Sequence, residues 1–144
     1  MRASFALVAA ILLCGCAGSG VAPSGGGPAG QAKVTGTVAY MQRIALPPTA
    51  TIKVSLVDVS RADAPSITIG EQVIQTAGRQ VPFAFEIPYA PAKIEQRNSY
   101  AIQVRIEDAG KLLFISDTRH SVITRGAPTN VDIVVRPVGG PPPK

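Results

Sequence analysis

The sequence predicts an all-β domain, a single antiparallel β-sandwich of about seven to eight strands, with a small β-barrel as the alternative. Three observations predict this fold class. Apolar residues alternate with small or polar ones through the middle of the chain, no long stretch shows the period of a helix, and Pro, Gly and Asp clusters separate the alternating segments. The chain has 144 residues, of which 5% are aromatic, so it can form one modest domain.

The first element in chain order is a signal peptide, predicted over residues 1–15. Arg2 supplies a positive charge, and residues 3–13 are almost entirely apolar. This run is too short to span a bilayer, which requires about 20 apolar residues. Residues 13–16 read Leu-Cys-Gly-Cys, which is similar to a bacterial lipobox and implies cleavage before Cys16 and acylation of its thiol. The alternative is an ordinary signal peptide with incidental cysteines.

Lipidation at Cys16 has consequences for the rest of the chain. Cys14 would leave with the signal peptide, so the mature protein would have no free thiol for a disulfide or a nucleophile. Two or more acyl chains would hold the protein stably to membrane lipid. The resemblance to a lipobox also implies sorting: Ala17 stands where an inner-membrane retention signal would usually show Asp, so we expect an outer-membrane, periplasm-facing protein. The periplasmic face of the inner membrane is the alternative.

Residues 16–32 are predicted to be the lipidated cysteine and a flexible tether. From residue 17 to residue 32 there are six glycines, two prolines, two serines and no charged side chain. Such a composition does not bury enough apolar surface to fold, and its end-to-end distance is roughly 20–25 Å. The glycines lack the flanking strand and helix of a phosphate-binding loop. At the other end, we expect residues 138–144 to be a disordered tail.

The domain is predicted over residues 33–137, where period-two alternation defines half-buried strands. Pro82 is expected at a sheet edge or a strand start, because proline has no N–H to donate. Asp108-Ala109-Gly110 is expected to connect two strands as a tight hairpin. The alternating or fully apolar segments lie at 34–40, 52–56, 81–87, 100–106, 112–115 and 131–135.

The side chains offer little chemistry, and we predict no catalytic residue, metal site or cofactor. His120 is the one histidine and is interpreted as a surface-loop imidazole. Glu107 and Asp108 are sequence neighbours that would face opposite sides of a sheet, so they do not make an acid and base pair. Asp58-Val59-Ser60-Arg61-Ala62-Asp63 lacks the glycine and glutamate of a calcium loop, and we interpret Asp58, Ser60 and Asp63 as turn formers.

The net charge of +5 does not indicate nucleic-acid binding. The Lys and Arg residues are spread singly along the chain and are not interleaved with aromatic residues. Weak attraction to anionic lipid headgroups is compatible with such a surface.

Several segments together resemble the YbaY/YscW lipoprotein family over nearly the whole domain. The resemblance implies a lipobox-anchored β-sandwich, and YscW-type members of that family are pilotins that chaperone outer-membrane secretins in type III secretion. It carries no binding-residue motif that can be transferred to this chain. The segments are 34–38, 44–48, 54–60, 82–85, 100–106 and 112–114.

These observations predict a membrane-anchored envelope lipoprotein that acts as a non-enzymatic binding or assembly module. The alternative is a secretin pilotin of type III secretion, and an envelope enzyme is a third reading. An exposed sheet edge offers one binding mechanism, because an extended segment of a partner could add to it as a strand. A secretin or another envelope protein is the expected partner, together with membrane lipid through acylated Cys16.

Overall fold

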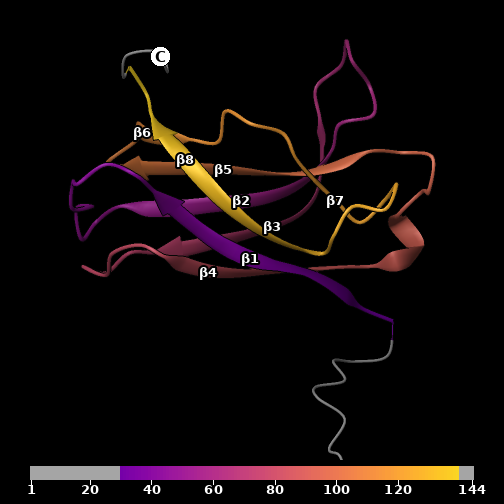
Figure 1. Cartoon of the computed structure of the whole chain (residues 1–144), viewed down its shortest axis with the longest axis horizontal. Coiled ribbons are helices and arrows are strands. Elements are labelled where there is room, and N and C mark those ends of the chain that lie inside the picture. The colour runs from indigo at the N-terminus through magenta and orange to yellow at the C-terminus, as the bar shows by residue number, and fades with distance from the viewer. Residues whose placement is uncertain (1–29, 140–144) are drawn as a thin grey trace, which may run out of the picture.

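The computed structural model of the protein describes residues 30–139, which form strands and one short 3-10 helix, η1 (Pro91–Lys93). The all-β prediction is confirmed (Figure 1). No helix of this described part is long and apolar enough to cross a membrane. The strands are β1 (Ala32–Tyr40), β2 (Thr51–Asp58), β3 (Ile67–Gln75), β4 (Phe83–Tyr89), β5 (Tyr100–Asp108), β6 (Lys111–Ile115), β7 (His120–Val122) and β8 (Asn130–Pro137).

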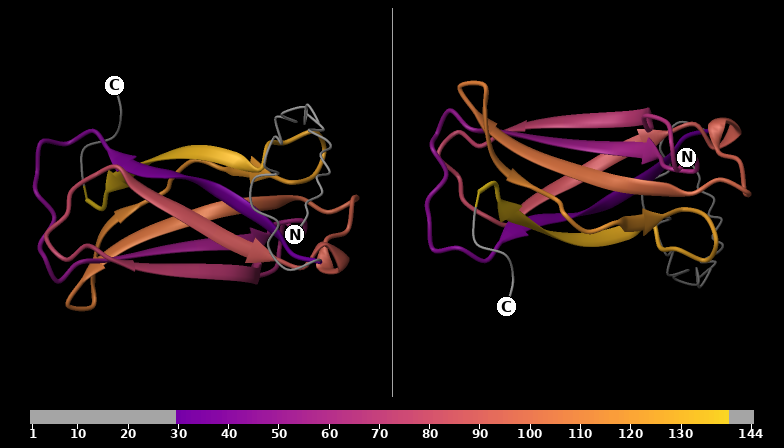
Figure 2. Two further views of the ribbon diagram at one scale, coloured as in Figure 1. Left: turned by 90° about the horizontal axis from the view of Figure 1, so that it is seen from below. Right: turned by 90° about the horizontal axis from the view of Figure 1, so that it is seen from above.

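The strands form one eight-stranded sheet that folds over on itself. Its order is β3-β2-β5-β6-β8-β1-β4, and β7 pairs with β5 beside β6. Figure 2 shows β8 and β1 stacked over β2, β3 and β5, so that the two parts of the sheet enclose the core like a sandwich. Because the β6–β8 pair joins the two layers, the sheet closes nearly into the barrel that the sequence offers as its alternative.

One pair of strands departs from the predicted antiparallel arrangement. β1 and β8 run parallel, in a register that matches Thr35 with Asn130 and Tyr40 with Val135. Parallel neighbours need a long crossover connection, and here every other strand of the domain lies between β1 and β8 in the chain. No hairpin therefore fixes their relative direction.

The core fills the space between the two layers with the inward residues of the alternating strands. β4 shows the pattern most clearly, because its buried and exposed residues alternate without a break from Phe83 to Tyr89. Tyr40 and Phe114 stack with ring centroids 4.8 Å apart and close the core at the end where β1 finishes. The buried apolar cluster also contains Val34, Val38, Ile52, Val54, Leu56, Phe85, Ile87, Ile102, Val104, Ile106, Val122, Ile133 and Val135.

Two strands were not among the predicted segments. β3 is an exposed end strand whose residues from Ile67 onward do not alternate strictly, and Gly70 interrupts the pattern. β7 has three residues. The structure also extends β4 through Pro88, where the sequence suggests a break. Pro88 is compatible with this position because β4 is the last strand of the sheet. Pro82 directly precedes β4, as expected for a strand start.

The β5–β6 hairpin forms as predicted, with a two-residue turn. Ala109 has φ of 47° and Gly110 has φ of 79°, which is the left-handed conformation that a type I′ turn requires. The turn matches the right-handed twist of the strands and places Asp108 opposite Lys111.

Candidate partner-binding surface

The predicted lipidation site, Cys16, lies outside the described residues, as do Cys14 and Ala17. The predicted anchor and its sorting signal therefore stay predictions. β1 begins at Ala32, so the segment that carries them joins the domain at the end where β1 starts.

The structure corrects the interpretation of His120 as a loop residue. It begins β7 and pairs with Ile102 of β5, and its side chain is half-buried. Its Nε2 atom is buried and has no hydrogen-bond partner among residues 30–139. Burial lowers the pKa of the imidazole from its usual 6.5, although the charge of Asp117 acts in the opposite direction. Burial therefore favours a neutral imidazole.

Asp58 and Ser60 form the predicted turn after β2. The carboxylate of Asp58 accepts hydrogen bonds from the Ser60 N–H at 2.9 Å and the Asn98 side chain at 2.9 Å. Burial acts to raise the pKa of Asp58, but these hydrogen bonds and the charge of Arg61 outweigh it and lower the pKa. The Ser60 hydroxyl accepts from the Ser99 N–H at 2.9 Å. These groups fasten two loops together.

Of the adjacent carboxylates Glu107 and Asp108, the second takes part in holding the domain together. The Thr49 hydroxyl donates to Asp108 Oδ1 at 2.6 Å, so this carboxylate holds the β1–β2 connection against the β5–β6 hairpin. Within the described chain, no group of three or more His, Cys, Asp or Glu residues is placed to hold a metal ion.

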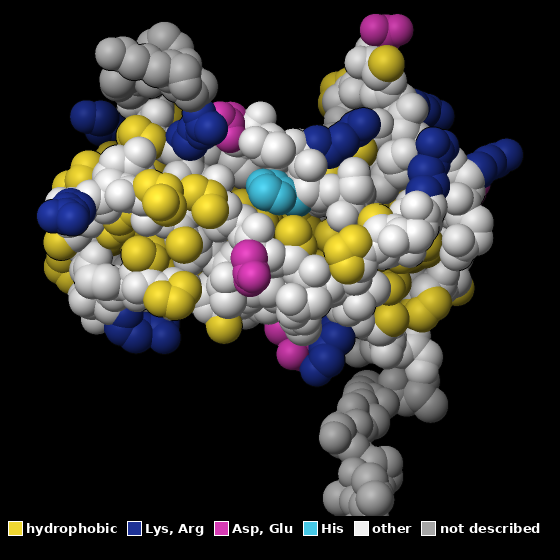
Figure 3. Space-filling view, viewed as in Figure 1, with side chains coloured by type: hydrophobic (Ala, Val, Ile, Leu, Met, Phe, Trp, Pro, Cys, Tyr) yellow, Lys and Arg dark blue, Asp and Glu magenta, His cyan; other side chains and the backbone are white. Residues whose placement is uncertain are grey.

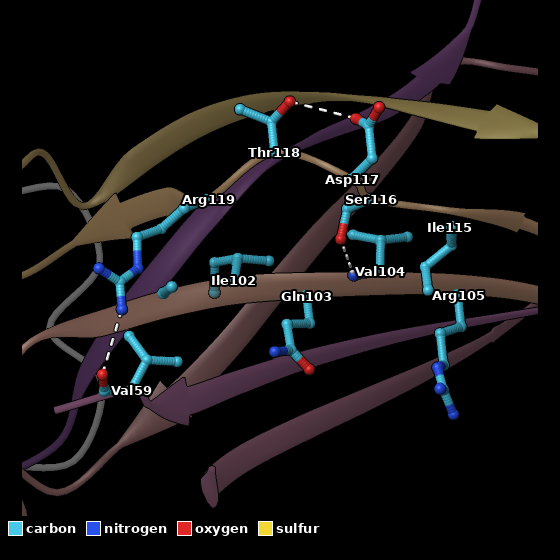
Figure 4. Close-up of a pocket in the computed structure, with 11 residues that line it drawn as sticks. Val59, Ile102, Gln103, Val104, Arg105, Ile115, Ser116, Asp117, Thr118 and Arg119 are labelled. Atoms are coloured by element: carbon cyan, nitrogen blue, oxygen red, sulfur yellow. Dashed lines mark hydrogen bonds between the residues drawn. The ribbon is translucent and has the colours of Figure 1, made fainter. Parts of the chain in front are cut away.

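A groove of about 390 Å³ lies along β5, where the connection from β6 to β7 bulges away from it. The Ser116 hydroxyl accepts a hydrogen bond from the Val104 N–H at 3.0 Å, and the Arg119 guanidinium donates to the Val59 carbonyl at 3.1 Å. Figure 4 shows Gln103 and Arg105 extending from β5 on the same side of the strand. The Ser116 hydroxyl thus supports the bulge, and the groove brings together no nucleophile and base.

The sheet edges, where strand addition was predicted, lie against each other. β3 and β4 are the two ends of the strand order, and no backbone pairing joins them in the described residues. Instead, the side-chain oxygen of Gln72 accepts a hydrogen bond from the Glu86 N–H at 2.7 Å. A Cβ atom at Gly70 would lie 2.8 Å from Ile87 Cγ2, so the strands are closely packed there. Strand addition at either edge requires this seam to open.

The described part of the chain is thus a nearly closed all-β domain with shallow surface hollows and no assembled catalytic set. Residues 29–135 match the family described as type III secretion system lipoprotein chaperone (YscW). The chain belongs to this family, as its segments predicted.

Two known proteins are similar to this chain. The uncharacterized lipoprotein YbaY of Escherichia coli (strain K12) is 39% identical over 108 residues, which are 75% of this chain and 56% of that relative. This chain therefore spans about half the length of that curated relative. A solved structure of an alternative pilotin from the type II secretion system of Vibrio cholerae superposes with a TM-score of 0.73 and 44% identity. The match covers 76% of this chain and 99% of the pilotin chain.

Proposed function

We propose that this protein is a membrane-anchored envelope lipoprotein that binds an outer-membrane secretin and assists its assembly, as a pilotin does. The observation that carries this proposal is the match over 99% of the Vibrio cholerae pilotin chain at 44% identity. The match to the lipoprotein chaperone family over residues 29–135 supports the same activity. The family match covers nearly the whole β-domain, so the domain itself would be the binding unit.

The anchor in this proposal is Cys16, acylated after cleavage of residues 1–15. Ala17 after the cysteine favours outer-membrane sorting over retention in the inner membrane. The segment from residue 17 to residue 32 is uncharged and rich in glycine, and it would hold the domain in the periplasm close to the membrane. Such confinement raises the effective concentration of the domain toward membrane-bound partners.

The proposed action is binding without turnover. Pilotin-like assistance needs an interface and an anchor, and neither requires a catalytic group. An envelope enzyme is the competing class, and it would need a nucleophile with a base or a metal. His120 begins a strand with its Nε2 atom buried, and the Ser116 hydroxyl is engaged by the Val104 N–H. The His120 imidazole is therefore partly enclosed by the fold, and the Ser116 hydroxyl is already used in a hydrogen bond.

The test is to detach the domain from the membrane while keeping it folded. A Cys16→Ala variant with an ordinary signal-peptidase cleavage site should be exported and folded but should fail to support secretin assembly. The measurement is the amount of heat-resistant secretin multimer in the outer membrane of the native host. Intact-mass analysis of the membrane-extracted parent chain should show loss of residues 1–15 and added acyl mass.

Affinity purification of the native chain after cross-linking should recover a secretin. Full secretin assembly with the Cys16→Ala variant would contradict an anchored pilotin role. Recovery of no envelope polypeptide, together with turnover of a small substrate by the purified domain, would instead favour the enzyme class.

A further inference from the structure

An apolar surface lies at the end of the domain where β1 and β8 finish. Met41 is 80% exposed, Ile44 58% and Val138 51%, and Val134 on the outer face of β8 is 45% exposed. We call these four residues the tip patch. Tyr40 pairs with Val135 across the parallel strands, so Met41 and Val138 follow neighbouring strand ends. Figure 3 shows apolar side chains gathered over this end of the molecule.

Cationic side chains surround the tip patch. Arg43 is in the same connection as Met41 and Ile44, Arg79 is in the β3–β4 connection, and Lys111 begins β6. None of the three forms a salt bridge within residues 30–139. Figure 3 shows Lys and Arg side chains around the edge of the apolar area.

The carboxylates at this end reduce the positive charge of the rim only in part. Glu107 and Asp108 lie on the β5–β6 hairpin near Lys111, and Asp108 already accepts the hydrogen bond from Thr49. Arg136 of β8 is held by Asp117 at 2.9 Å. The connection that carries Met41 and Ile44 therefore has Arg43 as its one charged side chain, and no carboxylate belongs to it.

The connection that carries the patch also holds an unsatisfied polar atom. Gln42 Oε1 is buried and has no hydrogen-bond partner in the described structure. The Tyr40 hydroxyl donates to the Ile44 carbonyl, so the connection folds back on the end of β1. Leaving a buried acceptor unpaired is unfavourable, and a partner that shifts this connection could supply the missing donor. This observation is independent of the exposed apolar side chains and indicates the same place.

Resting on the proposed pilotin function, we infer that the tip patch is where the partner polypeptide docks, through an amphipathic segment bordered by Asp and Glu side chains. The apolar side of that segment would cover Met41 and Ile44, and its carboxylates would pair with Arg43, Arg79 and Lys111. Buried apolar contacts at the centre would supply most of the affinity, and the charged rim would speed association and select acidic partners.

Two other occupants fit the patch less well. A second copy of this chain would bring like cationic rims together, which is repulsive. The membrane that carries the proposed anchor is joined to the opposite end, because β1 begins there and its nine residues span about 30 Å. Figure 1 shows the start of β1 at the far end of the molecule from the ends of β1 and β8. The patch therefore lies at the end of the domain opposite to the start of β1.

The test places a photo-cross-linking amino acid in the full chain in its native host, in place of Ile44. The matched control replaces Ile67, which is 55% exposed at the opposite end of the domain. We expect an adduct with an envelope polypeptide from position 44 and none from position 67. Mass spectrometry of the adduct should map the cross-link to an apolar segment with flanking acidic residues.

Two double variants then separate the centre of the patch from its rim. Met41→Gln with Ile44→Gln should lower recovery of the partner by about tenfold, and Arg43→Glu with Lys111→Glu by about three- to tenfold. The rim effect should shrink at high salt. Lys93→Glu in η1, at the opposite end of the domain, should change neither the recovery of the partner nor its salt dependence. All of these side chains are exposed, so the urea midpoint of each variant should match the parent chain and show that folding is intact.

The outcomes distinguish this inference from the proposed function. If Met41→Gln with Ile44→Gln leaves secretin assembly unchanged while Cys16→Ala abolishes it, the docking site is wrong and the pilotin role stands. An adduct of twice the chain mass would show that the patch binds a second copy of the chain. Binding to vesicles of phosphatidylglycerol and phosphatidylethanolamine that depends on Met41 and Ile44 would show that it binds a membrane. Failure of both the anchor and patch variants to affect any partner would remove the proposed function itself.

Discussion

Gly36 lies in the middle of β1, where the parallel neighbour β8 passes closer than a side chain allows. A Cβ atom at this position would lie 1.8 Å from the Val131 carbonyl oxygen and 2.9 Å from Phe85 Cζ. The first of these atoms is backbone, so it moves only if β8 moves. The need for glycine at this position therefore comes from a close approach of two strands that are distant in the sequence.

We predict that Gly36→Ala destabilises the domain by about 3 kcal/mol, because the added methyl group must displace β8 or the Phe85 ring. Urea unfolding followed by circular dichroism measures the change. Gly78→Ala is the control: its Cβ would meet nothing within 4 Å, but Gly78 has φ of 80°. Backbone strain alone should cost about 1–2 kcal/mol there. Equal losses in the two variants would contradict the role given to the close approach.

Two turns of the domain share one conformation. Ala109-Gly110 joins β5 to β6, and Ala77-Gly78 has nearly the same φ values, 48° and 80°, between β3 and β4. The Arg79 N–H donates to the Thr76 carbonyl at 2.9 Å and closes this second turn. An alanine in the left-handed region is unfavourable, whereas asparagine tolerates it.

Replacing Ala109 by Asn should therefore stabilise the domain, by about 0.5–1 kcal/mol, because an Asn-Gly pair suits the type I′ turn better. Ala109→Val should destabilise the domain, since a β-branched side chain is strained at positive φ. Thermal unfolding of both variants and of the parent chain measures the two changes in stability. A stabilising valine, or an asparagine that lowers the midpoint, would show that the turn conformation is not what limits the hairpin.

At the scale of elements, the sequence predicts a strand well where one face is fully buried, and poorly where the inner face is only half-buried, as in β3. β4 and β5 alternate because one face of each lines the core, so their residues carry the period-two signal. β3 is an end strand with exposed Ile67 and Val73, and its apolar residues therefore do not alternate in the same way. The Ala77-Gly78 turn is a signal that could have marked the end of β3, because it interrupts the chain between Gln75 and the β4 pattern.

The local sequence pattern does not show which distant segments pair with each other. The parallel alignment of β1 with β8 and the approach of β3 to β4 each join strands through contacts that no turn specifies. The tip patch has the same origin, because Met41 and Val138 come together only when β1 and β8 pair. The turn at Asp58 could be predicted more directly, because its hydrogen bond with the Ser60 N–H joins residues that are two positions apart in the chain. The loop assignment of His120 failed because three residues are too few to show a period.

The whole domain depends on β8 because this strand joins the two layers. It pairs with β1 on one side and with β6 on the other, and it buries Ile133 and Val135 in the core. Without it, β6 and β1 would become open edges and the inner faces of both layers would be exposed to water. Each lost apolar side chain would remove about 1.5–3 kcal/mol of burial, which together is a large share of a small domain's stability.

We therefore predict that a fragment of residues 33–137 folds alone, whereas a fragment of residues 33–129 does not. The longer fragment contains every residue of the buried cluster, from Val34 to Val135. Its far-UV circular dichroism spectrum should be that of a β protein, with one cooperative urea transition. The shorter fragment should show neither feature. A cooperative transition of the shorter fragment would mean that the two layers hold together by packing alone, without β8. Aggregation of the longer fragment while the full chain stays folded would show that the domain needs the segments around it.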